Sequence, residues 1–481
     1  MSDLFEFKGA AGAGYAQPLP LLDEESAREC IPEGMRRKAL PRWPKASEPE
    51  LVRHYTWLST RNFGIDTGFY PLGSCTMKHN PRLNERIVQL PGMNDIHPLA
   101  PESHLQGLMA IYFEMQEMLA HCSGMDQVTL QPVAGAQGEF TAIRCIQEYH
   151  RSLGESERTE VIVPDSAHGT NPASVVMAGF DVIQVKSDQR GRVDLDDLRE
   201  KLSTEVAGMM LTQPNTLGLF EEHISEITGL IHEAGGLMYM DGANLNALLG
   251  LVNPADMGFD IVHINLHKTF STPHGGGGPG AGPIGVTSEL AKFLPLPLVI
   301  EKDGKYSLHR DLPDSVGRVH AFFGNFGILV RAYTYIRMLG LDGIQAISRL
   351  AILNANYLMS KLTDAYEVAF DGPCMHEFVL SASRQKKRGV RALDIGKRLL
   401  DFGFHAPTIY FPLNVPEALM TEPTDSETME SLDRFAEAML KIDEESKSDP
   451  EKVRNAPYST PVRRLDETAA NRTPDLRWIP E

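Results

Sequence analysis

The residue best placed for covalent chemistry in this sequence is Lys268. It follows the apolar, β-branched stretch 261–264, which is typical of a buried strand, and it precedes four consecutive glycines at 275–278. A lysine that leaves a buried strand beside backbone able to approach a ligand closely is a candidate covalent amine. A single lysine at a loop edge is more often a solvated surface residue, so the interpretation depends on its surroundings.

Asp241 is one informative neighbour. It ends the apolar stretch 236–241 and precedes Lys268 by about one strand–helix–strand unit. Both residues are therefore expected at the carboxyl ends of neighbouring parallel strands, where open α/β sheets bind ligands. A reactive lysine needs a desolvated setting, and pyridoxal phosphate also needs an anion site and an acid near its ring nitrogen. Asp241 could be that acid.

Two further segments could complete such a site. The glycine-containing segment 134–139 precedes a predicted helix over 140–150, and a helix amino terminus binds anions through its free N–H groups and its dipole. His168 follows the predicted strand 161–163. Taken singly, 134–139 is also compatible with a plain strand-to-helix turn, and a single histidine is more often a packing residue. The position of His168 at a strand end favours ligand contact.

From about residue 125 onward, short apolar stretches alternate with amphipathic ones. Repeated strand–helix alternation of this kind predicts an α/β fold, with a mostly parallel sheet and helices on both faces. Polar clusters fall repeatedly at the carboxyl ends of the predicted strands, at 134–139, 165–171, 213–216, 241–246 and 265–269. This convergence strengthens the prediction of a ligand site more than any single motif does.

Changes of composition divide the chain into four predicted parts. Residues 1–125 are expected to form an N-terminal arm, interrupted by prolines, and then a helical segment. Residues 126–325 form the predicted cofactor-binding large domain, and 326–450 a smaller C-terminal α+β domain. The proline-containing stretch 451–481 is expected to be an extended tail.

Composition excludes several classes of function. The chain has 481 residues and a formal net charge of −18, which argues against nucleic acid and anionic membrane surfaces as partners. Its five cysteines show no C-x-x-C spacing, so we predict reduced thiols and no metal site. No apolar run reaches transmembrane length and the amino terminus does not resemble a targeting peptide, so we expect a cytoplasmic protein.

Two nucleotide-binding motifs are also disfavoured. The glycines at 275–280 match G-x-G-x-x-G, but the run contains Pro279, and a dinucleotide fingerprint requires a helix to open there. No glycine-rich phosphate loop of the G-x-x-x-x-G-K-[ST] type is present, because the glycines follow Lys268 instead of preceding it. A kinase or a dehydrogenase of the dinucleotide-binding type is therefore not predicted.

The segment 70–81, with the sequence Y-P-L-G-S-C-T-M-K-H-N-P, is dense in hydroxyl, thiol and basic side chains. By itself it is equally compatible with an ordered structural loop and with a loop that lines a ligand site. The chain closely resembles the P-protein of the glycine cleavage system, the decarboxylating glycine dehydrogenase, in this segment and in 135–139, 165–172, 213–216, 241–247 and 265–269. These matches cover most of residues 60–290. Because the single-chain P-protein is roughly twice as long, the chain resembles subunit 2, the cofactor-carrying half, of the split form.

The resemblance implies the fold of fold-type I pyridoxal phosphate transferases. By position, Lys268 matches the lysine that binds pyridoxal 5'-phosphate covalently, Asp241 the partner of the ring nitrogen, and His168 the histidine stacked on the ring. These three residues are the predicted catalytic residues. The implied cofactor-binding set adds the phosphate-cup residues, a residue on the other ring face and supporting contacts, namely Ala136, Gln137, Ala243, Thr216, His267 and Thr269.

The reaction implied by the resemblance is decarboxylation of glycine with transfer of the aminomethyl group to the lipoyl arm of H-protein. The implied assembly is a heterotetramer with a separate subunit 1. Arg318 is one candidate for binding the glycine carboxylate. Two alternatives stay open: another fold-type I decarboxylase or aminotransferase that acts on a free amino acid, and a structural subunit without activity. The presence of both Lys268 and Asp241 argues against the second.

Overall fold

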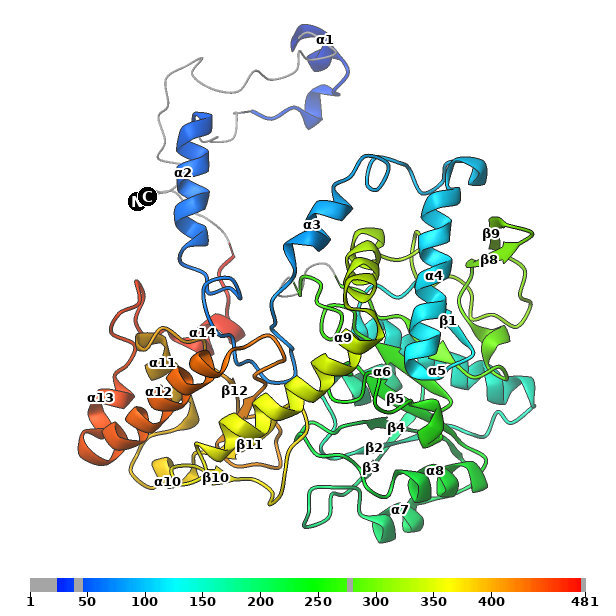
Figure 1. Cartoon of the computed structure of the whole chain (residues 1–481). Coiled ribbons are helices and arrows are strands. Elements are labelled where there is room, and N and C mark those ends of the chain that lie inside the picture. The colour runs from blue at the N-terminus through cyan, green and yellow to red at the C-terminus, as the bar shows by residue number, and fades with distance from the viewer. Residues whose placement is uncertain (1–23, 39–45, 275–279, 477–481) are drawn as a thin grey trace. The chain divides into compact units, whose positions relative to one another are not determined.

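The computed structural model describes residues 24–38, 46–274 and 280–476, and the chain divides into two compact units, Met1–Thr67 and Gly68–Glu481 (Figure 1). The glycine run at 275–278 therefore lies outside the described residues. The first unit contains α1 (Glu24–Glu29), η2 (Glu33–Met35) and α2 (Glu48–Ser59). Helix α2 begins with a capping box in which the Ser47 N–H donates to Glu50 at 2.7 Å.

A seven-stranded sheet forms the main layer of the second unit, in the order β1-β7-β6-β5-β4-β2-β3 (Figure 1). Its strands are β1 (Gln127–Thr129), β2 (Glu160–Pro164), β3 (Asp181–Val185), β4 (Val206–Thr212), β5 (Leu237–Gly242), β6 (Ile261–Ile264) and β7 (Ile284–Val286). Strands β3, β2, β4, β5 and β6 pair in parallel, whereas β7 is antiparallel to both of its neighbours. The predicted mostly parallel sheet is confirmed.

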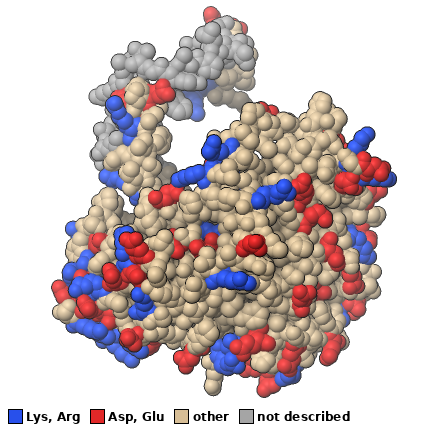
Figure 2. Space-filling view, viewed as in Figure 1, with Lys and Arg blue, Asp and Glu red and all other residues tan. Residues whose placement is uncertain are grey.

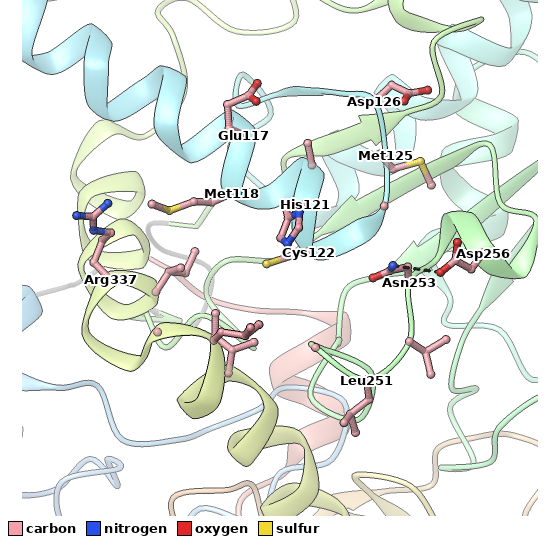
Figure 3. Close-up of a pocket in the computed structure, with 18 residues that line it drawn as sticks. Glu117, Met118, His121, Cys122, Met125, Asp126, Leu251, Asn253, Asp256 and Arg337 are labelled. Atoms are coloured by element: carbon pink, nitrogen blue, oxygen red, sulfur yellow. Dashed lines mark hydrogen bonds between the residues drawn. The ribbon is translucent and has the colours of Figure 1, made fainter.

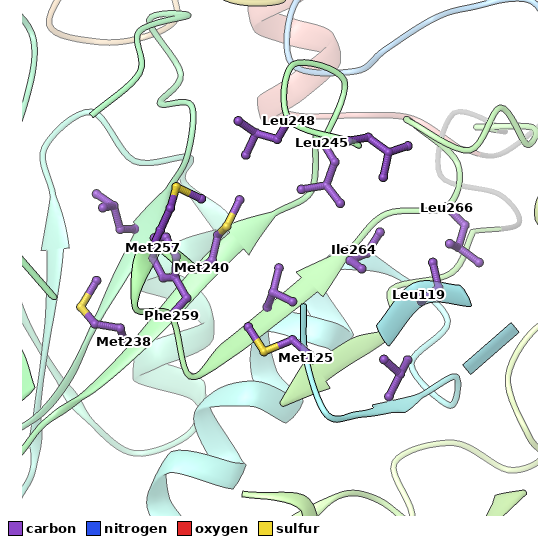
Figure 4. Close-up of a cluster of buried hydrophobic side chains, with 14 of the residues drawn as sticks. Leu119, Met125, Met238, Met240, Leu245, Leu248, Met257, Phe259, Ile264 and Leu266 are labelled. Atoms are coloured by element: carbon purple, nitrogen blue, oxygen red, sulfur yellow. The ribbon is translucent and has the colours of Figure 1, made fainter. Parts of the chain in front are cut away.

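Helices cover both faces of this sheet because strand side chains alternate between two cores. Met238 and Met240 of β5 point into one core, and Leu237 and Tyr239 of the same strand point into the other. Figure 4 shows the first of these cores, where Met238 and Met240 of β5 lie among leucine and methionine side chains from helices and connecting segments. That core is shared with α4 (Gln106–Ser123), α7 (Leu195–Lys201) and α8 (Ile224–Glu233). The second core is shared with α5 (Gly135–Ser152) and α6 (Thr170–Met177).

A smaller antiparallel sheet follows in the order β10-β11-β13-β12. Its strands are β10 (Glu367–Val368), β11 (Phe378–Ser381), β12 (Thr408–Ile409) and β13 (Ala418–Thr421). It has its own hydrophobic core, which it shares with α11 (Ala392–Asp401) and α12 (Met429–Ser448). The short helices α10 (Ser383–Lys386) and α13 (Pro450–Arg454) complete this α+β region.

Helix α9 (Phe326–Ser360) connects the two regions and belongs to both cores. Ile328 and Ile347 pack in the core of the large sheet, whereas Ala355 and Leu358 pack in that of the small sheet. The helix is interrupted at Gly340, whose φ of 63° lies in the left-handed region that glycine adopts without strain. Helix α9 therefore joins the two sheets and is kinked at Gly340.

The predicted extended tail over 451–481 is wrong in part, because it contains α14 (Glu467–Arg472) and most of α13. The Asp466 carboxylate caps α14 by accepting from the Ala469 N–H at 2.9 Å, and alanines favour the helix after it. Pro457 and Pro461 lie between α13 and α14, and Pro474 follows α14, so none of these three prolines interrupts that helix. The remaining elements are α3 (Arg82–Val88), η3 (Glu102–His104), η4 (Ala255–Met257), η5 (Ala291–Phe293), β8 (Leu298–Lys302) and β9 (Lys305–His309).

Figure 2 shows lysine and arginine side chains interspersed with aspartate and glutamate over one face of the protein. Among the described residues, no helix is long and apolar enough to cross a membrane.

Candidate active site

Lys268 lies where two neighbouring parallel strands end. Strands β5 and β6 pair in a register that places Asp241 beside His263, five residues before the lysine. The chain then turns, with the Lys268 N–H donating to the Asn265 carbonyl at 3.1 Å and the Ser271 N–H donating to the Lys268 carbonyl at 3.1 Å. The Lys268 side chain is half-buried. Within the described part of the chain, its ammonium makes no hydrogen bond or ion pair, so the amine is available to a ligand.

Asp241 is buried, with 4% of its surface exposed, and is held as a carboxylate. Burial by itself would raise its pKa, but His263, the Ala243 N–H and the charge of Lys268 together hold the pKa of Asp241 below its ordinary value. The Ala243 N–H donates to Asp241 Oδ1 at 3.0 Å, and the Thr212 hydroxyl donates to Oδ2 at 3.5 Å. An ionised acid therefore stands on the strand next to Lys268.

His263 supports Asp241 from the adjacent strand, and the sequence did not single it out. Its Nε2 lies 3.4 Å from Asp241 Oδ1, and its Nδ1 is hydrogen-bonded to the Tyr239 hydroxyl at 2.6 Å. His263 and Tyr239 are completely buried, and burial lowers the pKa of His263, so its ring is neutral near pH 7. A histidine in the middle of the apolar stretch I-V-H-I was the available signal. A polar ring on a buried strand must have a polar partner.

His168 stands at the end of β2 and is positioned by Thr170 and Glu139. The Thr170 hydroxyl is 2.9 Å from His168 Nδ1 and donates to Glu139 at 2.8 Å. Burial and the charge of Lys268 lower the pKa of His168, so its imidazole is neutral near pH 7. Burial and the charge of Asp241 raise the pKa of Glu139 to about 7. Phe411 packs edge-on against the His168 ring at 5.6 Å.

Ala136 and Gln137 lie in the first turn of α5, as the predicted phosphate cup requires. The two ends of the Gln137 side chain are engaged with backbone: its amide donates to the Val319 carbonyl at 2.7 Å and its oxygen accepts from the Val133 N–H at 2.8 Å. The Gln137 side chain is therefore occupied, and the groups that a predicted phosphate cup can offer here are the backbone N–H groups of Ala136 and Gln137. Gly282 passes so close that an added Cβ would collide with the Ala134 carbonyl.

His267 and Thr269 flank the lysine. The Ala281 N–H is 3.4 Å from His267 Nδ1, and burial with the nearby Lys268 charge lowers the pKa of His267 to about 3. The Thr269 hydroxyl accepts from the Leu245 N–H at 2.9 Å. His267 is thus a neutral ring at the base of the lysine loop, and Thr269 ties that loop to the segment after β5.

Two other predicted positions differ in how they relate to this group. Thr216 is buried and donates to the Ser166 carbonyl, so it joins the loops after β2 and β4 near His168. Arg318, the candidate for the glycine carboxylate, is exposed and donates to the carbonyl of Ala321 at 3.1 Å. Among the described contacts, none links Arg318 to Lys268 or Asp241. The structure gives Arg318 no role in this group.

The loop 70–81, which the sequence left undecided, packs against the small sheet. Leu72 forms a β-bridge with Thr421, and the Gly73 N–H donates to the Met420 carbonyl at 3.3 Å. Lys78 is buried and forms an ion pair with Asp425 at 2.9 Å. Cys75 in the same loop lies close enough to Lys268 for the lysine charge to lower the pKa of the thiol, although burial raises it overall. The loop is therefore part of the surroundings of the lysine.

Cavity size alone does not identify this site. A cavity of about 1200 Å³ is formed by the carboxyl end of α4, the turn at 250–253 and the kink of α9 (Figure 3). Its charged lining includes Glu117, Asp256 and Arg337. None of the residues predicted to bind a cofactor lines it. The chemistry of the strand ends, not the volume of a hollow, indicates the functional site.

The residues around Lys268 fit pyridoxal phosphate. The three demands are an unpaired amine, an ionised acid on the neighbouring strand and a helix amino terminus for the phosphate. Several buried polar atoms in this region also lack a hydrogen-bond partner among the described residues, which suits a polar ligand. These atoms are Asn246 Oδ1, Asn265 Oδ1 and Thr272 Oγ1.

The fold and this residue set define a class, the fold-type I enzymes that use pyridoxal phosphate. Residues 22–306 match the family model described as glycine cleavage system P-protein, and residues 347–460 match glycine dehydrogenase, C-terminal domain. The structure is similar to the crystal structure of a glycine decarboxylase (P-protein) of the glycine cleavage system in inhibitor-bound form. The TM-score is 0.72 at 18% identity, with 89% of this chain and 100% of that chain covered.

Two relatives are similar over nearly the whole chain. A probable glycine dehydrogenase (decarboxylating) subunit 2 from Caldanaerobacter subterraneus subsp. tengcongensis is 54% identical over 475 residues, which cover 99% of this chain and 98% of that protein. The corresponding protein of Exiguobacterium sibiricum is 55% identical over 478 residues, covering 99% and 97%. The chain therefore belongs to the glycine cleavage system P-protein family, and the cofactor of that class is pyridoxal phosphate.

Proposed function

We propose that this chain is the catalytic subunit of a two-subunit glycine decarboxylase and that Lys268 binds its pyridoxal phosphate covalently. Membership of the P-protein family supports the reaction. The observation that carries the assignment of the residue is the half-buried Lys268 amine beside the ionised Asp241 on the neighbouring parallel strand.

When bound, pyridoxal phosphate supplies a cationic ring that accepts the electron pair left when glycine loses its carboxylate as carbon dioxide. Asp241 holds a proton at the ring nitrogen, because its own carboxyl stays ionised next to His263 and the Ala243 N–H. The neutral His168 and the small side chain of Ala243 provide surfaces for the ring. The first-turn N–H groups of Ala136 and Gln137 in α5 would hold the phosphate, and His267, Thr216 and Thr269 would be supporting contacts.

Glycine is the substrate in this proposal, and the lipoyl arm of H-protein receives the aminomethyl group. The naming of the relatives as a subunit 2 supports a separate subunit 1 as partner, and we propose a heterotetramer with two copies of each subunit. A cytoplasmic enzyme is consistent with the absence, among the described residues, of a membrane-spanning helix. Co-purification of the two subunits and the mass of their complex test this assembly.

Lys268→Ala tests the proposal directly. The purified wild type is expected to show the near-visible absorbance of bound cofactor, and the variant is expected to lose it, because no amine remains to form the covalent bond. Lys292→Ala is the matched control, since Lys292 is a half-exposed lysine paired with Asp314 at 3.4 Å. An unchanged spectrum in Lys268→Ala would refute the assignment of the lysine.

A second assay separates glycine decarboxylation from the two alternatives. Exchange of labelled bicarbonate into the carboxyl of glycine, dependent on H-protein, is expected for the wild type with subunit 1. Another decarboxylase or aminotransferase would turn over a free amino acid without H-protein. A chain that binds no pyridoxal phosphate, even with subunit 1 present, would be a structural subunit.

A further inference from the structure

Three buried ionisable side chains of the small-sheet region form a group that the cofactor site does not include. They are His376, Glu377 and Glu422, which are 2%, 3% and 0% exposed. One potential ligand or proton-carrying atom of each lies within 4.8 Å of the others. Two carboxylates this close and this buried cannot both remain charged without compensation, because like charges in a desolvated site repel strongly.

Glu422 is the member of the pair that hydrogen-bond donors surround. Its Oε2 accepts from the Thr76 N–H at 2.9 Å, and its Oε1 accepts from the Thr76 hydroxyl at 2.7 Å. The side-chain amides of Asn244 and Asn246 donate to Oε1 at 2.8 and 2.9 Å. Hydrogen bonds to a carboxylate stabilise its charged form, and four such donors among the described residues face Glu422.

Glu377 is the protonated member. It has one donor, the Ser74 N–H, which is 2.8 Å from its Oε2. Burial and the charge of Glu422 raise the pKa of Glu377 to about 8, so near pH 7 its carboxyl group carries a proton. Its other oxygen, Oε1, lies 3.6 Å from His376 Nε2.

His376 gives independent evidence that this group is built around a proton or a ligand. Both of its ring nitrogens are buried and have no hydrogen-bond partner within the described residues. Burial lowers the pKa of His376, so the ring is neutral near pH 7 and one nitrogen can accept a proton. A buried imidazole without partners, directed at two carboxyl groups, is costly unless a function retains it.

The group stands beside Lys268. Asn244 and Asn246, which bond to Glu422, flank Leu245, whose N–H is bonded to Thr269 at 2.9 Å. Thr269 directly follows the lysine, and the charge of Lys268 lowers the pKa of Glu377. The segment 244–246 therefore links the carboxyl pair to the loop that carries the amine.

The same glutamates hold the loop 70–81 in a strained shape. Ser74 and Thr76 have φ values of 61° and 49°, a backbone conformation that residues other than glycine rarely adopt. Glu377 binds the N–H of Ser74 and Glu422 the N–H of Thr76, so both strained residues are fixed. Cys75 lies between them, and Lys268, Glu422 and Glu377 are its ionisable neighbours.

The proposed reaction needs a proton for the sulfur that departs from the lipoyl disulfide. The bond between the methylene carbon and the carboxylate of glycine breaks, and carbon dioxide leaves. The electron pair forms a new carbon–sulfur bond to one sulfur of the lipoyl disulfide. The sulfur–sulfur bond breaks, and its pair goes to the second sulfur, which becomes a thiolate. One proton must be taken up there to give the thiol.

We propose that Glu377 stores the proton that the departing lipoyl sulfur takes up. Glu422 is the charged neighbour that keeps this proton on Glu377, and His376 is the adjoining imidazole that can accept a proton. This inference rests on the proposed function, because it requires the lipoyl arm as acceptor. After transfer, Glu377 is left as a carboxylate and regains its proton from solvent. Glu377 is suited to general acid catalysis, because a carboxylic acid that remains protonated near pH 7 can give its proton to a thiolate.

A divalent metal ion bound by the same three side chains is the competing explanation. The structure favours the proton, because the lone pairs of Glu422 are already engaged by N–H and O–H donors. Metal analysis of the purified complex distinguishes the two. A stoichiometric ion that is lost in Glu377→Gln would overturn the proton store.

The test compares Glu377→Gln, Glu377→Asp and a matched control in the complex of both subunits with pyridoxal phosphate. Glutamine keeps the size of the side chain and an acceptor for the Ser74 N–H but carries no acid proton; aspartate keeps the acid. The control is Glu221→Gln, because Glu221 is also buried, has a raised pKa and accepts from the Val193 N–H at 2.9 Å.

Two readouts are expected to separate the variants. The spectral response to glycine without H-protein should be unchanged in Glu377→Gln, because no sulfur departs in that step. Carbon dioxide release with lipoylated H-protein should slow by roughly 10²- to 10⁴-fold, the usual contribution of a general acid. Glu377→Asp should keep part of the wild-type rate, and the control Glu221→Gln should keep all of it.

The dependence on pH gives a third readout that a merely structural role would not move. The wild-type rate should decline as pH rises through the range in which Glu377 loses its proton, and Glu377→Gln should lose this decline. An infrared band of a protonated carboxyl group at neutral pH should likewise disappear in Glu377→Gln. A variant that keeps the wild-type rate and pH profile overturns the proton store and leaves the proposed function intact. A wild-type complex that releases no carbon dioxide from glycine refutes the proposed function and the inference with it.

Discussion

Asp241 and Glu377 are two buried carboxyl groups near the same lysine, and their neighbours drive their pKa values in opposite directions. Asp241 stands on a parallel strand beside His263 and a backbone N–H, and its pKa lies below the ordinary value. Glu377 stands beside Glu422, and its pKa is raised to about 8. Equal burial therefore gives one permanent anion and one stored proton. The difference shows that the partner of a buried acid decides its chemical role.

The largest expected effect comes from the anionic side of this comparison. Asp241→Asn removes the charge that holds a proton at the cofactor ring, and we expect the rate of glycine–bicarbonate exchange to fall by roughly a hundredfold or more. Bound cofactor should persist, because Lys268 is unchanged. A variant that keeps both the cofactor and the wild-type rate would show that the charge of Asp241 is not used.

The stability of the protein should show the two acids in separate pH windows. A raised pKa means that the folded state binds the proton more tightly, so Glu377 makes stability fall as pH rises from about 4.5 to about 8. A lowered pKa means the reverse, so the contribution of Asp241 is present above about 3.8 and is lost as pH falls through its folded pKa. Denaturant unfolding at several pH values measures both.

Single variants assign these two windows. Glu377→Gln should make the upper window shallower, with the contribution of Glu139 remaining, because the pKa of Glu139 is also raised, to about 7. Asp241→Asn should remove the contribution of Asp241 to the lower window and leave that of Glu377 to the upper one. A Glu377→Gln protein that loses stability between about pH 4.5 and about pH 8 as steeply as the wild type would contradict a protonated Glu377.

A smaller effect is expected from the residue that positions Asp241. His263→Phe keeps a buried ring but removes the nitrogen that lies 3.4 Å from Asp241. The pKa of Asp241 should rise, so the acid limb of the pH–rate profile should move to higher pH. At a fixed pH on that limb, each unit by which the pKa of Asp241 rises should lower the rate roughly tenfold. The companion variant Tyr239→Phe/His263→Phe avoids leaving the Tyr239 hydroxyl without its partner. An unmoved acid limb in both would remove His263 from this role.

Much of the large-sheet side of the site could be predicted from the sequence, because it depends on local order. Asp241 and Lys268 each follow an apolar stretch, and parallel strands bring their carboxyl ends to one edge. The register that places Asp241 beside His263 was not predictable, since strand pairing is a non-local property. Glu139 lies in the segment 135–139 that was expected to belong to the site, yet its contact with Thr170 depends on how α5 and α6 pack.

The small-sheet side could not be predicted for the same physical reason on a larger scale. The loop at Ser74 and Thr76 meets Glu377 and Glu422 across some three hundred residues of chain. No spacing rule relates positions that far apart, and a glutamate in an apolar stretch gives no indication of its partner. The one local signal was chemical density in segment 70–81, which was equally compatible with a structural loop.

The bridge between Leu72 and Thr421 has a consequence for how the protein can be divided. The small sheet resembles a separable module, because it has its own core and its own family match. Its inner strand β13, however, also pairs at Thr421 with a segment that lies hundreds of residues earlier in the chain, and two of its glutamates bind that segment. A fragment that begins after residue 81 would lose this pairing and would leave Glu377 and Glu422 without the N–H groups of Ser74 and Thr76. Shortened or fused forms of the protein must therefore keep segment 70–81 together with the small sheet.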